Sequence, residues 1–448
     1  MTDTITALAT PPGNGGISVI RLSGPESTEI ADKVFKGNTS LLNVSTHTIH
    51  YGSIVDADLL IDQVTAAVFL NPQSYTGEDV VEISCHGGPL IVSQIINLLV
   101  KSGARLADAG GFTKRAFLNG KLDLTQVEAV ADMIHSVSIP GCQTSARQLS
   151  GNFTSRLSEF HAQLLDICSL VELELDFADE DVELIDRKSI GEKIETAIDF
   201  CIELSSSHRS AEILRSGYCV GIAGYPNAGK STLFNALLKR ERAIVSETPG
   251  TTRDYLDETI YVNDIAVRIT DTAGIRETKD SIEIDGLRMA ESVLDQSNMI
   301  LVLNDVTISP HYSNSLLFSI ETKYPGAKCY LVQNKIDKLH KEDRIDYPLS
   351  ISAKQNMFIN DLRDFIERDA MESTERCQDV LINQRQATLL DRAATELQNA
   401  MQLVMDEREN ELISLEIATA AKTLGEITGE TWSEEVLNNI FSRFCIGK

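Results

Sequence analysis

The chain has 448 residues, of which 42% are hydrophobic and 24% are charged, a balance typical of a folded protein with two or three domains. Its formal net charge of −26 argues against a uniformly basic surface, so a nucleic-acid partner would have to meet local cationic patches or a second protein. No apolar run reaches the ~18 residues of a membrane span, the start of the chain lacks the pattern of a secretory signal, and no C-x-x-C pair occurs, so we expect a cytoplasmic protein without a zinc site.

Residues 1–118 alternate short β-rich runs with glycine and proline, which predicts an N-terminal α+β domain. Strands are expected at Ile17–Leu22, Val64–Leu70 and Val80–Ser84. A helical run, Leu90–Ser102, follows the last of them.

Residues 119–216 have a helical pattern, with Pro140-Gly141 predicting a local break. We interpret the acidic run Glu172–Asp186 as a solvated helix end and loop. Apolar residues at steps of three and four share one helix face: Leu157, Phe160, Leu164, Ile167 and Val171.

Residues 217–378 alternate strands and helices, which predicts a parallel sheet with crossover helices. A linker around Met371–Cys377 then leads into a second helical block, residues 379–448, with Leu389 and Leu397 on its apolar face. Neither helical block alone offers a closed core. The two are therefore expected to pack together as one helical domain, with the α/β unit inserted between its halves. The predicted fold is multidomain: an N-terminal α+β domain, a central helical domain and an inserted α/β P-loop GTPase domain.

The segment Gly224–Ser231 fits the phosphate-loop pattern G-x-x-x-x-G-K-[ST] and lies between a strand-like run, Tyr218–Ala223, and a helix-like run, Thr232–Leu238. Lys230 is expected to reach the β- and γ-phosphates, and the Ser231 hydroxyl to bind Mg²⁺. The predicted phosphate-binding residues are Asn227, Ala228, Gly229, Lys230, Ser231 and Thr232.

Two further nucleotide motifs follow in the expected order. Asp271-Thr272-Ala273-Gly274 ends the apolar run Ile265–Ile269, where Asp271 would hold the Mg²⁺ shell and the Gly274 amide would face the γ-phosphate. Asn334-Lys335-Ile336-Asp337 follows a strand, and the Asp337 carboxylate can accept two hydrogen bonds from guanine that adenine does not offer. Ser352-Ala353-Lys354 is expected to close over the base, so the predicted nucleotide is GTP.

The residue after D-T-A-G is Ile275, which cannot orient the attacking water as glutamine does in Ras-like proteins. Another group must therefore place the water. Glu283 and the nearer Glu277 are both candidates on this reasoning, and either can also be read as a solvent-exposed helix residue.

Several further motifs occur outside the nucleotide motifs: the switch loop Ser246-Glu247-Thr248-Pro249-Gly250-Thr251-Thr252-Arg253-Asp254, together with Ala9–Gly13, Arg21, Tyr75–Asp79, His86–Gly88, Arg115–Leu124 and the tail Phe444–Lys448. With these motifs, the whole chain resembles the MnmE (TrmE) family of tRNA-modifying GTPases. One segment departs from the family pattern P-G-E-F, because this chain has Ala109-Gly110-Gly111-Phe112.

The resemblance implies that the chain acts on tRNA as a homodimer with a flavin-dependent partner, MnmG (GidA), in a heterotetramer. The pair would add an aminomethyl or carboxymethylaminomethyl group at C5 of the wobble uridine, with a one-carbon tetrahydrofolate as carbon donor. By motif match, the folate-binding residues are Arg21, Glu82, Lys121 and Lys448. Cys445 is read either as a nucleophile or as a packed tail residue.

The resemblance also implies GTP hydrolysis that uses K⁺ in place of an arginine finger. Thr252 then matches the residue that caps Mg²⁺, and Glu283 matches the catalytic glutamate in preference to Glu277. The K⁺ ligands matched to the family are Asn227, Ser246, Thr248 and Thr251, and the rest of that loop, Glu247, Pro249 and Gly250, contacts the nucleotide.

A rival interpretation is a regulatory GTPase, such as a ribosome-assembly switch, whose flanking domains only bind RNA. Such a protein is expected to carry a basic RNA-binding domain, and the net charge of −26 argues against one.

Overall fold

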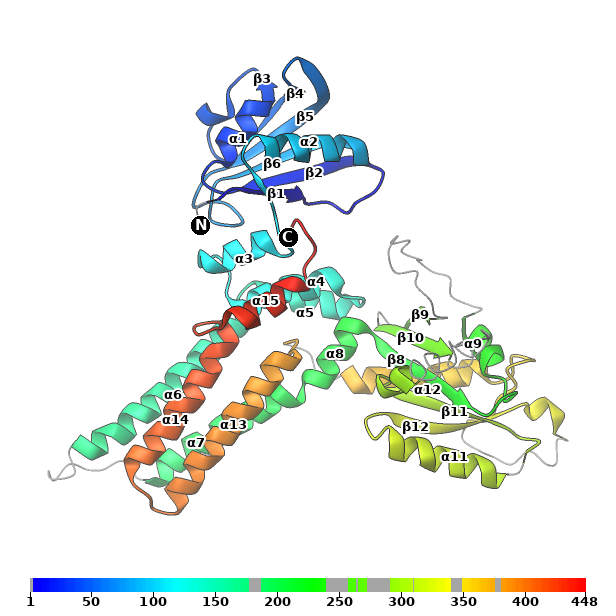
Figure 1. Cartoon of the computed structure of the whole chain (residues 1–448). Helices are drawn as coiled ribbons and strands as arrows, with labels where there is room; N and C mark the ends of the chain where they lie inside the picture. The colour runs from blue at the N-terminus through cyan, green and yellow to red at the C-terminus, as the bar shows by residue number, and fades with distance from the viewer. Residues whose placement is uncertain are drawn as a thin grey trace. The chain divides into compact units, whose positions relative to one another are not determined.

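The computed structural model describes residues 3–176, 187–238, 257–262, 265–271, 291–308, 310–339, 349–374 and 380–448. The chain forms two compact units, each coloured by residue number in Figure 1. Unit 1 comprises Met1–Ala131, Gln148–Cys201 and Leu389–Lys448, and unit 2 comprises Asp132–Arg147 and Ile202–Thr388. Within the described ranges, every helix is too short or too polar to cross a membrane.

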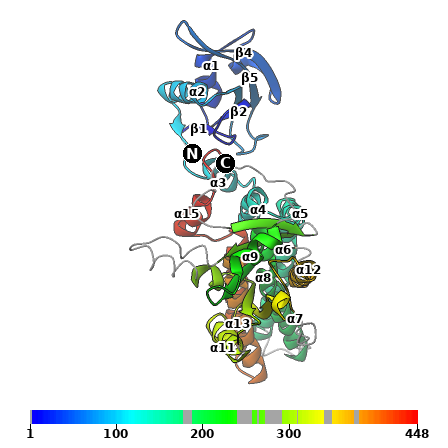
Figure 2. The same ribbon diagram turned by 90° about the vertical axis from the view of Figure 1, so that its right-hand side faces the viewer.

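Unit 1 begins with a seven-stranded mixed sheet in the order β3-β4-β5-β6-β2-β1-β7. Alternate residues of β2 and β6 face helices α1 and α2, which lie on the same side of the sheet in Figure 2. All three predicted strands and the predicted helix are confirmed. The elements are β1 (Ile5–Leu8), β2 (Gly15–Ser23), α1 (Ser27–Val34), β3 (Phe35–Gly37), η1 (Leu41–Asn43), β4 (Thr48–Asp56), β5 (Leu59–Phe69), β6 (Val80–Gly87), α2 (Pro89–Lys101) and β7 (Arg105–Leu106).

The helices that follow the N-terminal sheet, on either side of the α/β insertion, are α3 (Gly111–Leu118), α4 (Leu124–His135), α5 (Ile139–Leu149), α6 (Asn152–Asp176), α7 (Arg187–Ser206), α13 (Gln384–Met405), α14 (Asn410–Thr428) and α15 (Glu434–Ser442). The predicted apolar face of α6 is buried along its length. α6 packs on α14, where the Cys168 sulfur lies 3.1 Å from the Ser414 hydroxyl oxygen. Leu124 of α4 and Phe441 of α15 share a second core cluster. Helices from both sides of the insertion therefore share their cores, as predicted.

The predicted break at Pro140-Gly141 lies at a helix start. α4 ends at His135, and Pro140 occupies the first turn of α5, where its missing N–H costs nothing because first-turn N–H groups have no partner within the helix. The predicted linker around Met371–Cys377 is wrong in its first part, because α12 (Ile359–Thr374) continues through Met371. Ile366 and Ala370 bury the end of that helix against the sheet of unit 2.

Unit 2 contains a five-stranded sheet in the order β12-β11-β8-β10-β9, parallel except for the edge strand β9. α9 and α12 pack on one face and α11 on the other. The predicted α/β domain with crossover helices is confirmed. Its elements are α8 (His208–Ser216), β8 (Tyr218–Gly224), α9 (Lys230–Leu238), β9 (Asp257–Val262), β10 (Ile265–Asp271), β11 (Met299–Asp305), α11 (Pro310–Lys323), β12 (Lys328–Asn334), η3 (Ile336–Lys338) and α12.

The parallel strands of this sheet end at one edge, the side on which open α/β sheets bind their ligands. β8 ends at Gly224, β11 at Asp305 and β12 at Asn334. Register pairs Leu303 with Gly224 and Asp305 with Asn334, so the ends of these three neighbouring strands lie side by side.

Candidate functional site

The phosphate loop leaves β8 at Gly224 and enters α9 at Lys230. The Lys230 ammonium donates to the carbonyls of Gly224, at 3.0 Å, and Tyr225, at 3.1 Å, so the loop wraps around it. Ser231 and Thr232 are exposed in the first turn of α9, where free N–H groups favour anions. The loop residues predicted from the sequence therefore lie in one turn between β8 and α9.

Asn334 connects the phosphate loop to the predicted guanine-binding segments. Its side-chain amide donates to the Ala228 carbonyl at 2.8 Å, and its Oδ1 accepts from the N–H groups of Lys335, at 2.8 Å, and Ala353, at 3.0 Å. A Cβ on Gly229 would lie 2.4 Å from Asn334 Nδ2, so only glycine fits there. One buried side chain thus fixes three separate chain segments.

Asp337 is oriented by Ser352 of the S-A-K motif. Its Oδ1 accepts a hydrogen bond of 2.6 Å from the hydroxyl of Ser352, which is fully buried. Ala353 is also buried, whereas Lys354 is exposed. The sequence motifs N-K-x-D and S-A-K therefore meet, as the assignment to the two sides of one base-binding site requires.

Lys335 has two partners in this site. Its ammonium donates to the Asn227 carbonyl and to Asp305 Oδ2, each at 2.6 Å. Asp305 was not predicted from the sequence. Burial acts to raise the pKa of Asp305, but the hydrogen bonds from Lys335 and Thr307 outweigh it, so the pKa lies below its ordinary value. The only sequence signal was a carboxylate at the end of an apolar run.

The predicted folate-binding residues Arg21 and Glu82 form an ion pair on the face of the N-terminal sheet that α1 and α2 leave uncovered. They are register partners on β2 and β6, and Arg21 Nε donates to Glu82 Oε1 at 2.8 Å. The Arg21 guanidinium carbon lies 5.4 Å from the centroid of the Tyr75 ring and 5.5 Å from that of Phe112. The two rings were not among the predicted site residues, and they add apolar surface suited to a flat heterocycle.

Lys121 and Lys448 contact the segments that carry these two rings. Lys121 Nζ donates to the Pro72 carbonyl at 3.2 Å, in the loop that leads to Tyr75. The carbonyl of Lys448 accepts from the Phe112 N–H at 3.2 Å. Arg21 and Glu82 are in direct contact, whereas Lys121 contacts the loop before Tyr75 and Lys448 contacts Phe112 through its main-chain carbonyl.

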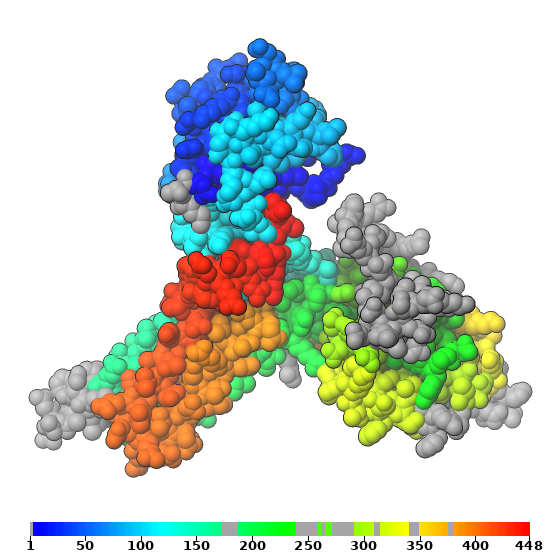
Figure 3. Space-filling model, viewed as in Figure 1, coloured from blue at the N-terminus to red at the C-terminus, as the bar shows by residue number. Residues whose placement is uncertain are grey.

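The C-terminal tail lies against α3, as the red and cyan segments in Figure 3 show. Ile446 forms a bridge with Ala109, and the Cys445 carbonyl accepts from the Gly110 N–H at 3.4 Å. Gly447 has a φ of 104°, and a Cβ there would lie 2.0 Å from the Leu8 carbonyl oxygen. The tail is therefore held by its backbone, and the Cys445 side chain is exposed.

Comparison with known proteins gives matches over the whole chain. The family model "MnmE helical domain" matches residues 124–445, and the model "GTP-binding protein TrmE N-terminus" matches residues 4–121. A curated relative named "tRNA modification GTPase MnmE" from Flavobacterium johnsoniae is 42% identical over 100% of this chain and 99% of its own length.

The chain belongs to the MnmE family. A second relative of the same name, from Christiangramia forsetii, is 39% identical over 100% of both chains. Among solved structures, Era in complex with MgGDPNP and nucleotides 1506–1542 of 16S ribosomal RNA is 28% identical, covers 34% of this chain and 56% of that chain, and has a TM-score of 0.26.

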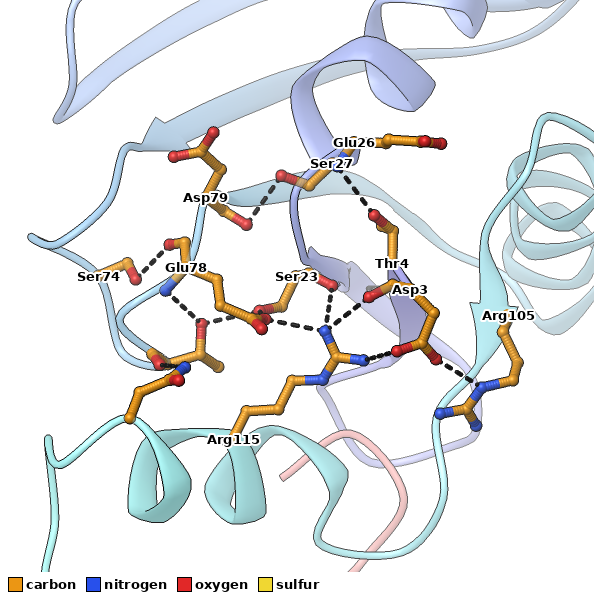
Figure 4. Close-up of polar contacts among 12 residues, drawn as sticks. Asp3, Thr4, Ser23, Glu26, Ser27, Ser74, Glu78, Asp79, Arg105 and Arg115 are labelled. Carbon is orange, nitrogen blue, oxygen red and sulfur yellow. Dashed lines mark hydrogen bonds and ion pairs between the residues drawn. The ribbon is translucent and has the colours of Figure 1, made fainter. Parts of the chain in front are cut away.

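Two MnmE-like motifs without an assigned chemical role, Tyr75–Asp79 and Arg115–Leu124, meet at Arg115 (Figure 4). Arg115 is 2% exposed. Its NH1 donates to Glu78 Oε2 at 2.9 Å and to the Ser23 carbonyl at 3.2 Å, and its NH2 donates to Asp3 Oδ1 at 2.9 Å. Arg115 thereby fixes α3 against the loop that contains Tyr75. These motifs position the two aromatic rings beside Arg21.

The departure from the P-G-E-F pattern of the MnmE family leaves the essential glycine in place. Gly110 has a φ of 65°, and a Cβ there would lie 2.9 Å from the Phe441 ring. At Gly111, the residue that replaces glutamate, the nearest atoms to an added Cβ are 3.6 Å away. The second position therefore has room for a side chain, and the local geometry does not depend on it.

Of Asp271, only the backbone is described, and it ends β10 opposite Ile222, at the same edge of the sheet as the phosphate loop. Several other predicted site residues lie outside the described ranges, so the structure does not bear on them. They are Ser246, Glu247, Thr248, Pro249, Gly250, Thr251, Thr252, Thr272, Ala273, Gly274, Glu277 and Glu283.

Proposed function

We propose that this MnmE-family chain hydrolyses GTP to drive modification of C5 of the wobble uridine in certain tRNAs. The observation that carries the proposal is a pair of hydrogen bonds of Asn334, which donates to Ala228 and accepts from Ala353 and so joins the phosphate loop to the guanine-binding segments. The family match over the full length of the chain supports the link to tRNA.

Within the nucleotide site, Lys230 stabilises the phosphates and Asp337 selects guanine. The Ser231 hydroxyl, with Thr252 and Asp271, supplies the oxygen ligands that Mg²⁺ prefers. Asn227, Ser246, Thr248 and Thr251 are proposed to hold K⁺, which supplies the positive charge that an arginine finger provides in other GTPases. Glu283 is the residue proposed to orient the attacking water.

In the N-terminal domain, Arg21, Glu82, Lys121 and Lys448 are proposed to bind a one-carbon tetrahydrofolate. The site suits such a molecule, because Arg21 and Glu82 offer a cation and a carboxylate, and two aromatic rings lie beside Arg21. The folate would supply the carbon atom. Cys445 keeps both interpretations, a nucleophile or a structural part of the tail.

The proposal includes a homodimer and a complex with the flavoprotein MnmG (GidA), acting in the cytoplasm. The group added would be carboxymethylaminomethyl or aminomethyl. We divide the chain into a folate-binding domain, residues 1–118, an inserted GTPase domain, residues 217–378, and a helical domain made of residues 119–216 and 379–448. With a net charge of −26, most of the cationic surface for tRNA is expected from the partner.

Two measurements test this function. The purified chain is expected to bind GTP at least about a thousandfold more tightly than ATP, because adenine leaves the Asp337 carboxylate unpaired. Wobble-uridine analysis of tRNA from cells lacking the protein is expected to show the unmodified base. Preference for ATP contradicts the nucleotide assignment. Normal wobble uridine with guanine binding intact favours the ribosome-assembly alternative.

Hydrolysis is expected to be at least about tenfold faster in K⁺ than in Na⁺, because removal of one well-placed charge or donor costs ~10²–10³ in rate and Na⁺ replaces K⁺ only partly. The measurement is GTP turnover at constant ionic strength in KCl or NaCl, with nucleotide affinity measured in both salts as the control. Equal turnover in the two salts removes the K⁺ assignment.

A further inference from the structure

The end of β11 lies between the two halves of the nucleotide site. β11 is hydrogen-bonded to β8, which leads into the phosphate loop, and to β12, which leads into the guanine-binding segment. Its last residue, Asp305, pairs in register with Asn334, and Leu303 pairs with Gly224. A side chain at this position can reach both loops.

Each carboxylate oxygen of Asp305 has its own partners. Oδ1 accepts from the Thr307 N–H at 3.0 Å and from the Thr307 hydroxyl at 2.7 Å. Oδ2 accepts from Lys335 Nζ at 2.6 Å. The two bonds from Thr307 hold the carboxylate in one orientation. The Asp305 side chain is 9% exposed, so little water competes for its oxygens.

Lys335 also donates to the Asn227 carbonyl, so a lysine held in place by Asp305 constrains the phosphate loop. Asn227 and Lys335 both have left-handed backbones, with φ of 65° and 66°. Asparagine adopts this conformation at little cost, but a lysine adopts it where surrounding contacts stabilise it. The bond between the two residues, anchored by Asp305, is such a contact.

We propose that Asp305 is a positioning residue that holds the Lys335 ammonium on the Asn227 carbonyl and so sets the shape of the phosphate loop from the guanine-binding side. The inference rests on the proposed GTP site and adds a residue to it. Asn227 is also a proposed K⁺ ligand, so Asp305 influences both nucleotide affinity and the K⁺ requirement, without touching the reacting atoms.

The test compares two isosteric variants of the full chain. Asp305→Asn removes the charge that fixes Lys335. Asp369→Asn is the matched control, because Asp369 is 8% exposed and also accepts from a lysine, Lys328 at 2.7 Å, in the same unit. Lys328 begins β12, at the opposite end from Asn334. Asp369 also accepts from the Tyr218 hydroxyl, so the control reports the effect of losing a buried carboxylate with at least as many partners as Asp305.

For Asp305→Asn, we expect about tenfold weaker GDP and GTP binding and an increase of about threefold in the K⁺ concentration for half-maximal turnover, because a partly buried charge-assisted bond is lost. The kcat at saturating GTP and K⁺ is expected to stay within about threefold of the unchanged chain, since Asp305 does not contact the reacting atoms. Asp369→Asn is expected to leave nucleotide affinity and the K⁺ requirement within about twofold of those of the unchanged chain. Its melting temperature is expected to fall about as much as that of Asp305→Asn.

A double variant isolates the route through the lysine. In a Lys335→Met background, Asp305→Asn is expected to weaken GDP binding by less than about twofold, because the group it positions is gone. Additive losses in the double variant, or equal losses in the two aspartate variants, overturn the proposal. If the unchanged chain binds GTP and Asp305→Asn binds it equally well, only this inference fails. If the unchanged chain binds no guanine nucleotide, the proposed function itself fails.

Discussion

Replacing Asp337 with asparagine is expected to weaken GTP binding by on the order of a hundredfold and to shift the preference toward xanthine nucleotides. The carboxylate accepts two hydrogen bonds from guanine, and each bond to a charged group contributes ~1.5–3 kcal/mol. Asparagine can accept only one of them and turns an N–H toward the guanine amine. Xanthine has an oxygen at that position, which the new amide donates to. The Ser352 hydroxyl, which lies 2.6 Å from Asp337 Oδ1, still donates to the side-chain oxygen of the new asparagine and orients that side chain.

The measurement is competitive binding of GDP, XDP and ADP to the unchanged chain and to Asp337→Asn. Asp361→Asn is the matched control, because Asp361 is an exposed aspartate in the first turn of α12 of the same unit. The control is expected to bind like the unchanged chain. If Asp337→Asn retains the original affinity for GDP and rejects XDP, then Asp337 does not contact the base.

Replacing Glu283 with alanine is expected to lower kcat for GTP by ~10²–10³, because a positioned carboxylate that handles the attacking water contributes ~10²–10⁴ in rate. GTP affinity is expected to change by less than about threefold, since the water is not part of the bound nucleotide. The physical reason to expect a substitute for the usual glutamine is Ile275, whose side chain has no polar atom.

Glu277→Ala is the internal comparison, because Glu277 lies closer to Ile275 in the sequence and carries the same functional group. Single-turnover hydrolysis and nucleotide binding are measured for both variants under saturating K⁺. A large loss of turnover in Glu277→Ala with Glu283→Ala unaffected reverses the assignment. Loss of binding in Glu283→Ala indicates a structural residue instead.

Periodicity and local motifs predicted the elements of this chain well, because each is a short-range property. The apolar residues of α6 recur at helical spacing, and Leu157 to Val171 are buried as that spacing predicts. The phosphate loop could be located for the same reason, since it must follow a strand and precede a helix. The linker near Met371 was misplaced because the charged residues there mark a helix end in the sequence. The apolar face of α12 stays covered up to that point, so the helix continues.

The parts of the site that the sequence did not reveal depend on contacts between distant segments. Asn334 bonds to Ala228, which is 106 positions earlier in the chain. Asp305 gains its role only because β11 lies between β8 and β12, and strand order cannot be read from a single aspartate. Tyr75 and Phe112 meet at Arg21 because the buried Arg115 ties their segments together.

The Tyr218 hydroxyl, at the start of β8, donates to Asp369 near the end of α12. The first strand of the α/β part and its last helix, α12, are therefore tied together inside unit 2. A segment whose ends are already adjacent can be inserted into a surface turn of another protein without forcing apart the two residues that flank the insertion. The same geometry makes residues in this stretch good candidates for transplantation into an unrelated carrier or for re-ordering by circular permutation.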